Sequence, residues 1–113
     1  MKTIMVHGYV MEDVALIVRA LREALKTDIG FISATGRGSE HVKDILDKAP
    51  KEPLRDATPK MLMFIEFDND SIYDSMVAFP EGIERPLFCM PTADNVEWPL
   101  SELLDHLVAE KGE

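Results

Sequence analysis

The chain has 113 residues, which suits one ordinary domain, and 46% of them are hydrophobic, enough for a buried core. Its 21 acidic and 12 basic residues give a formal net charge of -9, which repels a polyphosphate backbone and argues against nucleic-acid binding. A single cysteine leaves no intrachain disulfide to form, and no apolar run nears the roughly 20 residues that span a bilayer, so we expect a cytoplasmic protein without a membrane anchor.

The first half of the chain follows a strand, helix, strand, helix pattern. Residues 4–6 form a short apolar run typical of a strand buried on both faces. The apolar stripe within residues 14–25 predicts an amphipathic helix, and residues 29–34 predict a second strand. A glycine-containing loop then leads to Ser39, which we expect to cap the next helix at its N-terminus.

The second half repeats that order after a connector. Residues 50–60 contain three prolines and few apolar anchors, which indicates a connecting segment. The apolar run at residues 61–67 predicts the third strand, and a short helix follows from Asp68. Residues 87–90 predict the fourth strand, and a leucine-rich stripe within residues 100–108 predicts the last helix.

The two halves can be superposed without a gap. Moving residues 3–49 forward by 58 positions places them on residues 61–107, so that Met5 falls on Met63. Positions that are apolar in both halves then occur more often than the composition alone predicts. We therefore predict two pseudo-repeated βαβα halves within a single α/β domain, residues 1–113.

Alternating strands and helices favour parallel crossover connections. We predict a single four-stranded, mainly parallel sheet in the order 2-1-3-4, with helices on both faces. If a twofold axis along the strands relates the halves, the first and fourth helices share one face and the carboxyl ends of strands one and three meet. Open α/β sheets bind ligands where the winding reverses in this way. We therefore expect His7 and Tyr9 to face Glu66 and Asp68 across a crevice.

The turn around Arg37 and Ser39 is a second candidate site. Its glycines would let backbone amides converge on an anion, with Arg37 as the counter-charge. The turn lacks the Lys-Ser/Thr ending of a P-loop and the glycine spacing of a dinucleotide site, and such turns commonly only change the chain direction.

Three acidic residues near the start of the predicted third helix could hold a divalent cation. They are Glu66, Asp68 and Asp70. Helix capping and the helix dipole explain the two aspartates without a metal, so we predict no metal site. His7 could shuttle a proton at the predicted crevice or be a buried structural histidine, and Cys89 reads as an inert buried thiol.

Residues 92–104, Thr-Ala-Asp-Asn-Val-Glu-Trp-Pro-Leu-Ser-Glu-Leu-Leu, resemble the T-x-x-N-x-x-W-x-L-x-x-L signature of a small prokaryotic family catalogued only as a domain of unknown function. The resemblance is strongest over residues 61–110. It implies an uncharacterised compact α/β protein and supplies no activity. Physically, Asn95 can hydrogen-bond its own loop and Trp98 can pack on the helix that it introduces. Alternatively, Thr92 and Asn95 could face a ligand at the carboxyl end of the fourth strand.

No two residues have the spacing of a nucleophile and its base. The leading hypothesis is therefore a non-catalytic binding or regulatory module with no cofactor, which binds an unidentified protein partner or small molecule. The alternative is a small enzyme or ligand sensor that uses the crevice between the carboxyl ends of strands one and three. An exposed outer strand would also permit a homodimer.

Overall fold

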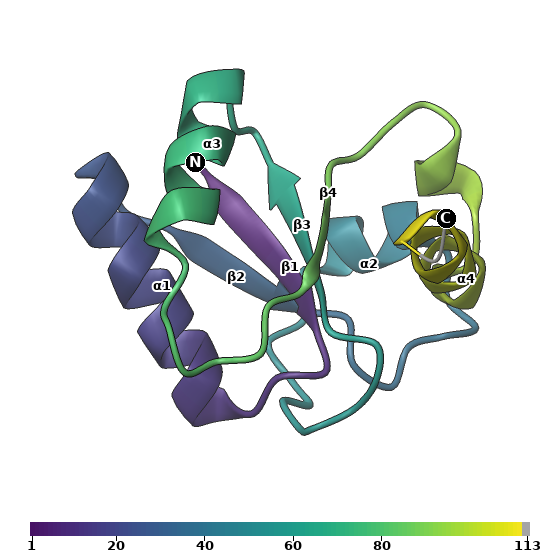
Figure 1. Ribbon diagram of the computed structural model, residues 1–113. Helices are drawn as coiled ribbons and strands as arrows, with labels where there is room; N and C mark the ends of the chain where they lie inside the picture. Colours follow the sequence, from purple (N-terminus) through teal and green to yellow (C-terminus); the bar gives the residue numbers. More distant parts are fainter. Residues whose placement is uncertain (112–113) are drawn as a thin grey trace.

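The computed structural model describes residues 1–111. Within them, no helix combines the length and apolar character needed to cross a membrane. The elements follow one another along the chain (Figure 1) as β1 (Thr3–His7), α1 (Met11–Leu25), β2 (Gly30–Ser33), α2 (Val42–Lys48), β3 (Met61–Ile65), α3 (Asn69–Ala78), β4 (Leu87–Cys89), the 3-10 helix η1 (Asn95–Glu97) and α4 (Leu100–Lys111).

The four strands form one sheet in the order β2-β1-β3-β4, which confirms the predicted strand order. β1 pairs with β2 in parallel, and β3 pairs with β4 in parallel. The central pair runs the other way: β1 and β3 are antiparallel, with Thr3 opposite Ile65 and His7 opposite Met61. The sheet is therefore mixed, and the prediction that strands one and three run in parallel is wrong.

The connector explains why β3 runs against β1. Its amide at Ala57 donates to the carbonyl of Gly8 at 3.2 Å. Two residues further on, the ring Nδ1 of His7 donates to the carbonyl of Pro59 at 2.7 Å. Both bonds hold the connector beside the carboxyl end of β1, so β3 begins there and has to run back along β1.

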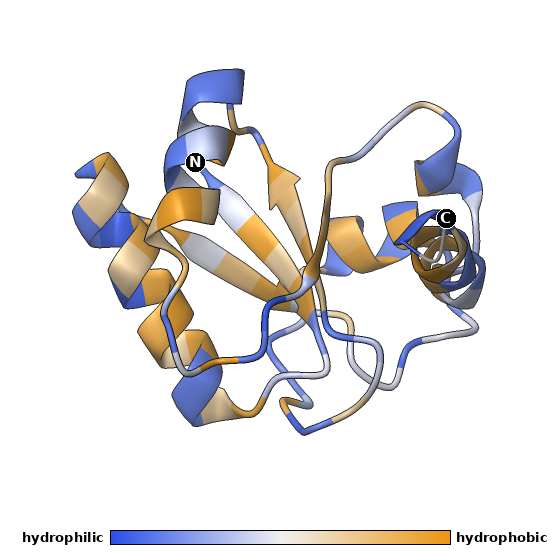
Figure 2. Ribbon diagram, viewed as in Figure 1, coloured by the Kyte–Doolittle hydropathy of each residue, from blue (hydrophilic) through white to orange (hydrophobic). Residues whose placement is uncertain are grey.

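Two apolar cores cover the two faces of the sheet. One joins α1 and α3 to the sheet through side chains such as Ile4, Val14, Ile17, Leu21 and Phe64. The other joins α2 and α4 to the opposite face through Met5, Ile45, Met63, Leu100 and Leu103. Figure 2 shows the hydrophobic residues concentrated in the central strands and on parts of the helices.

The prediction that the first and fourth helices share a face is wrong, because α1 lies beside α3 and α4 belongs to the core of α2. The reversed direction of β3 is the physical reason. β3 runs opposite to β1, and its crossover leads to the opposite edge of the sheet. These two reversals cancel, so a right-handed connection places α3 on the same face as α1.

Candidate functional site

The predicted crevice between strands one and three does not exist. His7 lies opposite Met61 at one end of the β1–β3 pair, and Glu66 follows Ile65 at the other end. The length of β1 between these ends is roughly 13 Å at about 3.3 Å per residue, too far for a shared proton transfer. The eight candidate residues fall into two separate groups: His7, Tyr9, Arg37 and Ser39 beyond β1 and β2, and Glu66, Asp68, Thr92 and Asn95 beyond β3 and β4.

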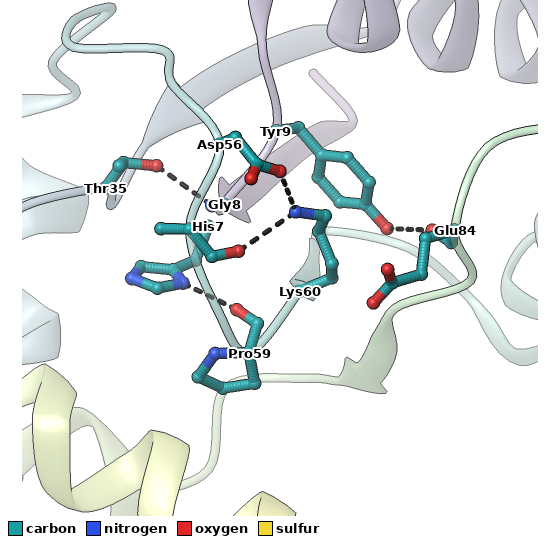
Figure 3. A network of polar contacts seen from close by, with 9 residues as sticks. His7, Gly8, Tyr9, Thr35, Asp56, Pro59, Lys60 and Glu84 are labelled. Atoms are coloured by element: carbon teal, nitrogen blue, oxygen red, sulfur yellow. Dashed lines mark hydrogen bonds and ion pairs between the residues drawn. The ribbon is translucent and has the colours of Figure 1, made fainter.

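Buried hydrogen bonds at the end of β1 engage His7 (Figure 3). The residue is 7% exposed, and the bond from its ring to the Pro59 carbonyl requires the ring proton on Nδ1. Next along the chain, the Gly8 amide donates to the Thr35 hydroxyl at 3.0 Å. These bonds join β1 to the connector and to the loop after β2. His7 therefore has the structural role that was one of its two interpretations.

Tyr9 is also part of the internal structure. Its ring is buried in the core of α1 and α3, and its hydroxyl donates to the carbonyl of Glu84 at 2.6 Å. Burial raises the pKa of Tyr9 well above its usual value, and the negative charge of Glu84 raises it further. The phenol therefore stays protonated at neutral pH.

Lys60 is a buried charge that sequence reasoning missed. Its side chain is only 9% exposed, and its ammonium forms a 2.6 Å ion pair with Asp56. It also donates to the Ala57 carbonyl at 3.0 Å and lies 5.6 Å from the centre of the Tyr9 ring. A lysine directly before the apolar run of β3 is the signal that could have identified it, because such a side chain must find partners.

Lys60 lines an open pocket of about 480 Å³ together with Arg85 and Lys111. Two of these residues already have partners within the protein. Asp56 neutralises Lys60, and the Arg85 guanidinium donates to the Met76 carbonyl at 2.8 Å. This pocket is therefore a weaker candidate for an anion site than its three basic residues suggest.

In the glycine turn, the Arg37 side chain has partners within the protein. The guanidinium of Arg37 pairs with Glu40 at 2.9 Å and donates to the carbonyl of Glu52 at 3.1 Å, which ties the turn to the connector. Helix α2 begins at Val42 with His41 at the N-cap position, so the predicted capping role of Ser39 is wrong. Two residues separate Ser39 from the helix, and Ser39 is exposed.

The two acidic candidates beyond β3 also have internal partners. The N-terminal ammonium lies 2.9 Å from the Glu66 carboxylate, and this hydrogen bond lowers the pKa of Glu66. The Ser71 hydroxyl donates to Asp68 and lowers the pKa of that carboxyl. Residues 1–111 contain no group of three or more His, Cys, Asp or Glu side chains that could hold a metal ion. Glu66 and Asp68 therefore both have partners within the protein.

The Thr92–Asn95 pair locks the loop after β4. The Thr92 amide donates to the Asn95 side-chain oxygen at 2.8 Å, and the Asn95 amide donates back to the Thr92 hydroxyl at 3.0 Å. The side-chain amide of Asn95 also donates to the Met90 carbonyl at 3.0 Å. This reciprocal pair has the form of a capping box and confirms the predicted loop-locking role of Asn95.

Trp98 and its neighbours join this loop to two helices. The Trp98 ring stacks on the ring of His106 in α4, with centroids 4.3 Å apart. The Trp98 carbonyl accepts from the amide of Val42 at 2.9 Å, and the Leu100 amide donates to the carbonyl of Glu40 at 2.8 Å. The segment therefore holds the starts of α2 and α4 together.

A pocket of about 360 Å³ lies between β4, this loop and α4. We call it the motif pocket, because Thr92, Asn95, Trp98 and Leu103 from the quoted motif line it. The remaining lining residues are Phe88, Cys89, Met90, Asp94, His106, Leu107 and Glu110. Two carboxylates and a tryptophan thus line it, without a lysine or arginine among the described lining residues. Such a pocket suits a positively charged group.

The thiol in the motif pocket lacks the lowered pKa of a catalytic cysteine. Burial, with a smaller effect from the negative charge of Glu110, raises the pKa of Cys89 to about 12. A thiol with this pKa is almost entirely protonated at neutral pH, whereas a catalytic cysteine needs a lowered pKa. The described lining of the motif pocket therefore presents negative charge and an aromatic surface.

A domain of unknown function (DUF3783) is found over residues 60–113. It begins at the last connector residue and covers β3, α3, β4 and the motif pocket. This confirms the resemblance to a family of unknown function for that half of the chain. No curated protein and no solved structure matches the chain.

Proposed function

We propose that this protein is a non-catalytic binding module that recognises a positively charged group in the motif pocket. The observation that carries the proposal is the composition of that pocket. Asp94 and Glu110 supply negative charge beside the Trp98 ring, and the described lining contains no lysine or arginine to compete with a bound cation. The formal net charge of -9 adds long-range attraction for a cationic partner.

Recognition in this pocket would rest on rigid groups. The Thr92–Asn95 bonds fix the loop that carries Asp94, and the stack on His106 fixes one face of Trp98. A cation bound here loses little energy to rearrangement of the site. Because Asp94 and Glu110 are exposed, we expect weak binding that salt screens.

The test uses two probes that differ by one charge: acetyl-lysine-methylamide and acetyl-norleucine-methylamide, which lacks the ammonium. We expect only the lysine probe to shift the Trp98 indole and Asp94 amide signals in an NMR titration. The variants Asp94→Asn and Glu110→Gln should each weaken the binding by about three- to tenfold, a loss on the order of 1 kcal/mol. Asp105→Asn changes an exposed charge of α4 outside the pocket and should have little effect. Equal shifts of the Trp98 indole and Asp94 amide signals with both probes would refute the proposal.

We further propose that the chain consists of two similar halves, related by an approximate twofold axis that passes through the sheet. Two observations support this. Met5 and Met63, which the 58-residue shift superposes, are direct partners. The same shift relates Val42 to Leu100 and Glu40 to Trp98. The hydrogen bond from the Val42 amide to the Trp98 carbonyl therefore corresponds to the bond from the Leu100 amide to the Glu40 carbonyl. The axis runs perpendicular to the sheet, and not along the strands, because β1 and β3 are antiparallel.

The cytoplasmic location and the binding of a protein partner or small molecule are predictions. A cytoplasmic location is favoured by the single cysteine, which has no second thiol in the chain to oxidise with. A homodimer is a weaker candidate, and static light scattering over a dilution series would detect it as a mass that rises with concentration.

A further inference from the structure

The two outer edges of the sheet differ in how they are covered. Beside β2, the Ser33 amide donates to the connector carbonyl of Pro50 at 2.6 Å, and Lys51 donates to the carbonyl of Phe31 at 2.9 Å. The connector therefore closes the β2 edge. Beside β4, no segment within residues 1–111 forms a comparable set of bonds.

The open edge of β4 presents backbone groups next to the motif pocket. The Leu87 amide donates to Lys60 on the β3 side at 2.9 Å. The backbone groups of the next residue, Phe88, therefore point away from β3, as on any unpaired sheet edge. Phe88, Cys89 and Met90 also line the motif pocket, so the free edge and the pocket form one continuous surface.

We propose that an extended, basic segment of a partner protein adds to β4 as a fifth strand and places a lysine or arginine in the motif pocket. This inference rests on the proposed function and names its partner. Main-chain bonds at the edge would provide affinity. Side chains alternate between the two faces of a strand, so only every second side chain of the segment would point to the face that carries the motif pocket.

Charge decides between a basic partner and a second copy of this chain. Two copies paired through β4 would bring two acidic motif pockets together and repel each other. A basic segment would neutralise Asp94 and Glu110. The side chains between its basic residues would point to the other face of the sheet, where the Arg85 guanidinium lies 5.1 Å from the centre of the Phe88 ring. These side chains should be apolar, because the charge of Arg85 would repel a second cation there. With only three residues in β4, we expect a weak, transient complex.

The test uses the full chain and the peptide acetyl-Lys-Val-Lys-Val-Lys-Val-Lys-amide. Two control peptides carry backbone N-methyl groups, one on the lysines and the other on the valines, and both keep the full charge. Only one set of amides can face β4 in an added strand. We therefore expect one control to lose about tenfold or more in affinity while the other binds like the parent peptide. Hydrogen exchange of the Phe88 amide should slow when the parent peptide is saturating.

Two results would overturn strand addition: equal binding by both controls, or an unchanged exchange rate at Phe88 under saturating peptide. If the acetyl-lysine-methylamide probe still shifts the Trp98 indole signal, only the fifth strand is refuted and the cation pocket stands. If neither that probe nor the parent peptide shifts it, both proposals fail.

Discussion

Met5 and Met63 lie directly opposite each other at the middle of the antiparallel pairing between β1 and β3. Both side chains are fully buried and belong to the core beneath α2 and α4. Opposed side chains in an antiparallel pair stand about 5 Å apart at their Cβ atoms, so each methionine fills space beside the other. This pair is therefore a direct, buried contact between the first and second halves of the chain.

Shortening either methionine should destabilise the protein strongly. We expect Met5→Ala and Met63→Ala each to reduce the free energy of unfolding by about 2–5 kcal/mol, measured by urea denaturation. The double variant should lose less than the sum, because the first cavity lets the second side chain rearrange. Val77→Ala, at an exposed position of α3, should stay within about 0.5 kcal/mol of the parent. Additive losses in the double variant would show that the two side chains are not coupled.

Gly8 is expected to be the least replaceable glycine. Its φ is +89°, and a Cβ at this position would collide with the Ala57 carbonyl oxygen of the connector. Gly82 has a similar φ of +90°, but nothing lies within 4 Å of its Cβ position. Gly82→Ala should cost about 1–2 kcal/mol from the backbone alone. Gly8→Ala should cost a further 1–3 kcal/mol or so because of the collision, measured by the same denaturation. Equal losses would mean that the connector moves aside freely.

The sequence predicted the order of elements and strands well, because these depend on local patterns. Apolar runs gave the four strands, and stripes such as Val14, Ile17 and Leu21 gave the buried side of a helix. The structural role of Asn95 was also readable, since an asparagine three residues after a threonine can close a loop upon itself. The prediction failed where partners distant in the chain decide the geometry.

The direction of β3 is the clearest case. Residues 61–65 are apolar on both faces and would fit beside β1 in either direction. The bonds from the connector to Gly8 and His7 decide it, and neither bond has a sequence signal. The wrong direction led to the prediction that Glu66 lies at the same end of the strand pair as His7, and the predicted crevice depended on that position. The expected place of Thr92 and Asn95 after the fourth strand did not depend on the direction of β3, because the loop and the helix that follow this strand are close to it in sequence.

The Thr92–Asn95 pair should behave as a structural lock. Asn95→Ala removes two hydrogen bonds of a buried side chain, and we expect a loss of about 1–3 kcal/mol in urea denaturation. Thr92→Ser keeps the hydroxyl that accepts from the Asn95 amide and should cost much less, whereas Thr92→Val should resemble Asn95→Ala. If Thr92→Val were as stable as the parent, the reciprocal bonds would contribute little to the fold.

The ion pair between Glu66 and the N-terminus should make stability depend on pH at the acidic end. The pKa of Glu66 is lowered by its hydrogen bond from the N-terminal ammonium, so the folded protein binds this proton more weakly than the unfolded chain. The stabilisation is therefore complete above the ordinary pKa of about 4.3 and is lost as the pH falls through the lower folded value.

Glu66→Gln should thus be less stable than the parent at pH 6, and the difference should shrink by pH 3. Because both partners are exposed, the effect is small and should fall with added salt. Glu81→Gln, at an exposed position after α3, is the matched control. A difference that stayed constant from pH 6 to pH 3 would rule out the ion pair as its source.

Cys89 should resist thiol reagents in the folded protein. With a pKa of about 12, its thiolate fraction at pH 8 is far below that of an unfolded cysteine. We expect its reaction with an aromatic disulfide reagent at pH 8 to be roughly a hundredfold slower in buffer than in urea, or slower still. Burial is the larger cause of the raised pKa and Glu110 the smaller one, so Glu110→Gln should speed the reaction only modestly. Fast labelling of the folded parent protein would mean that the thiol is accessible and ionised, and it would reopen a catalytic role for the motif pocket.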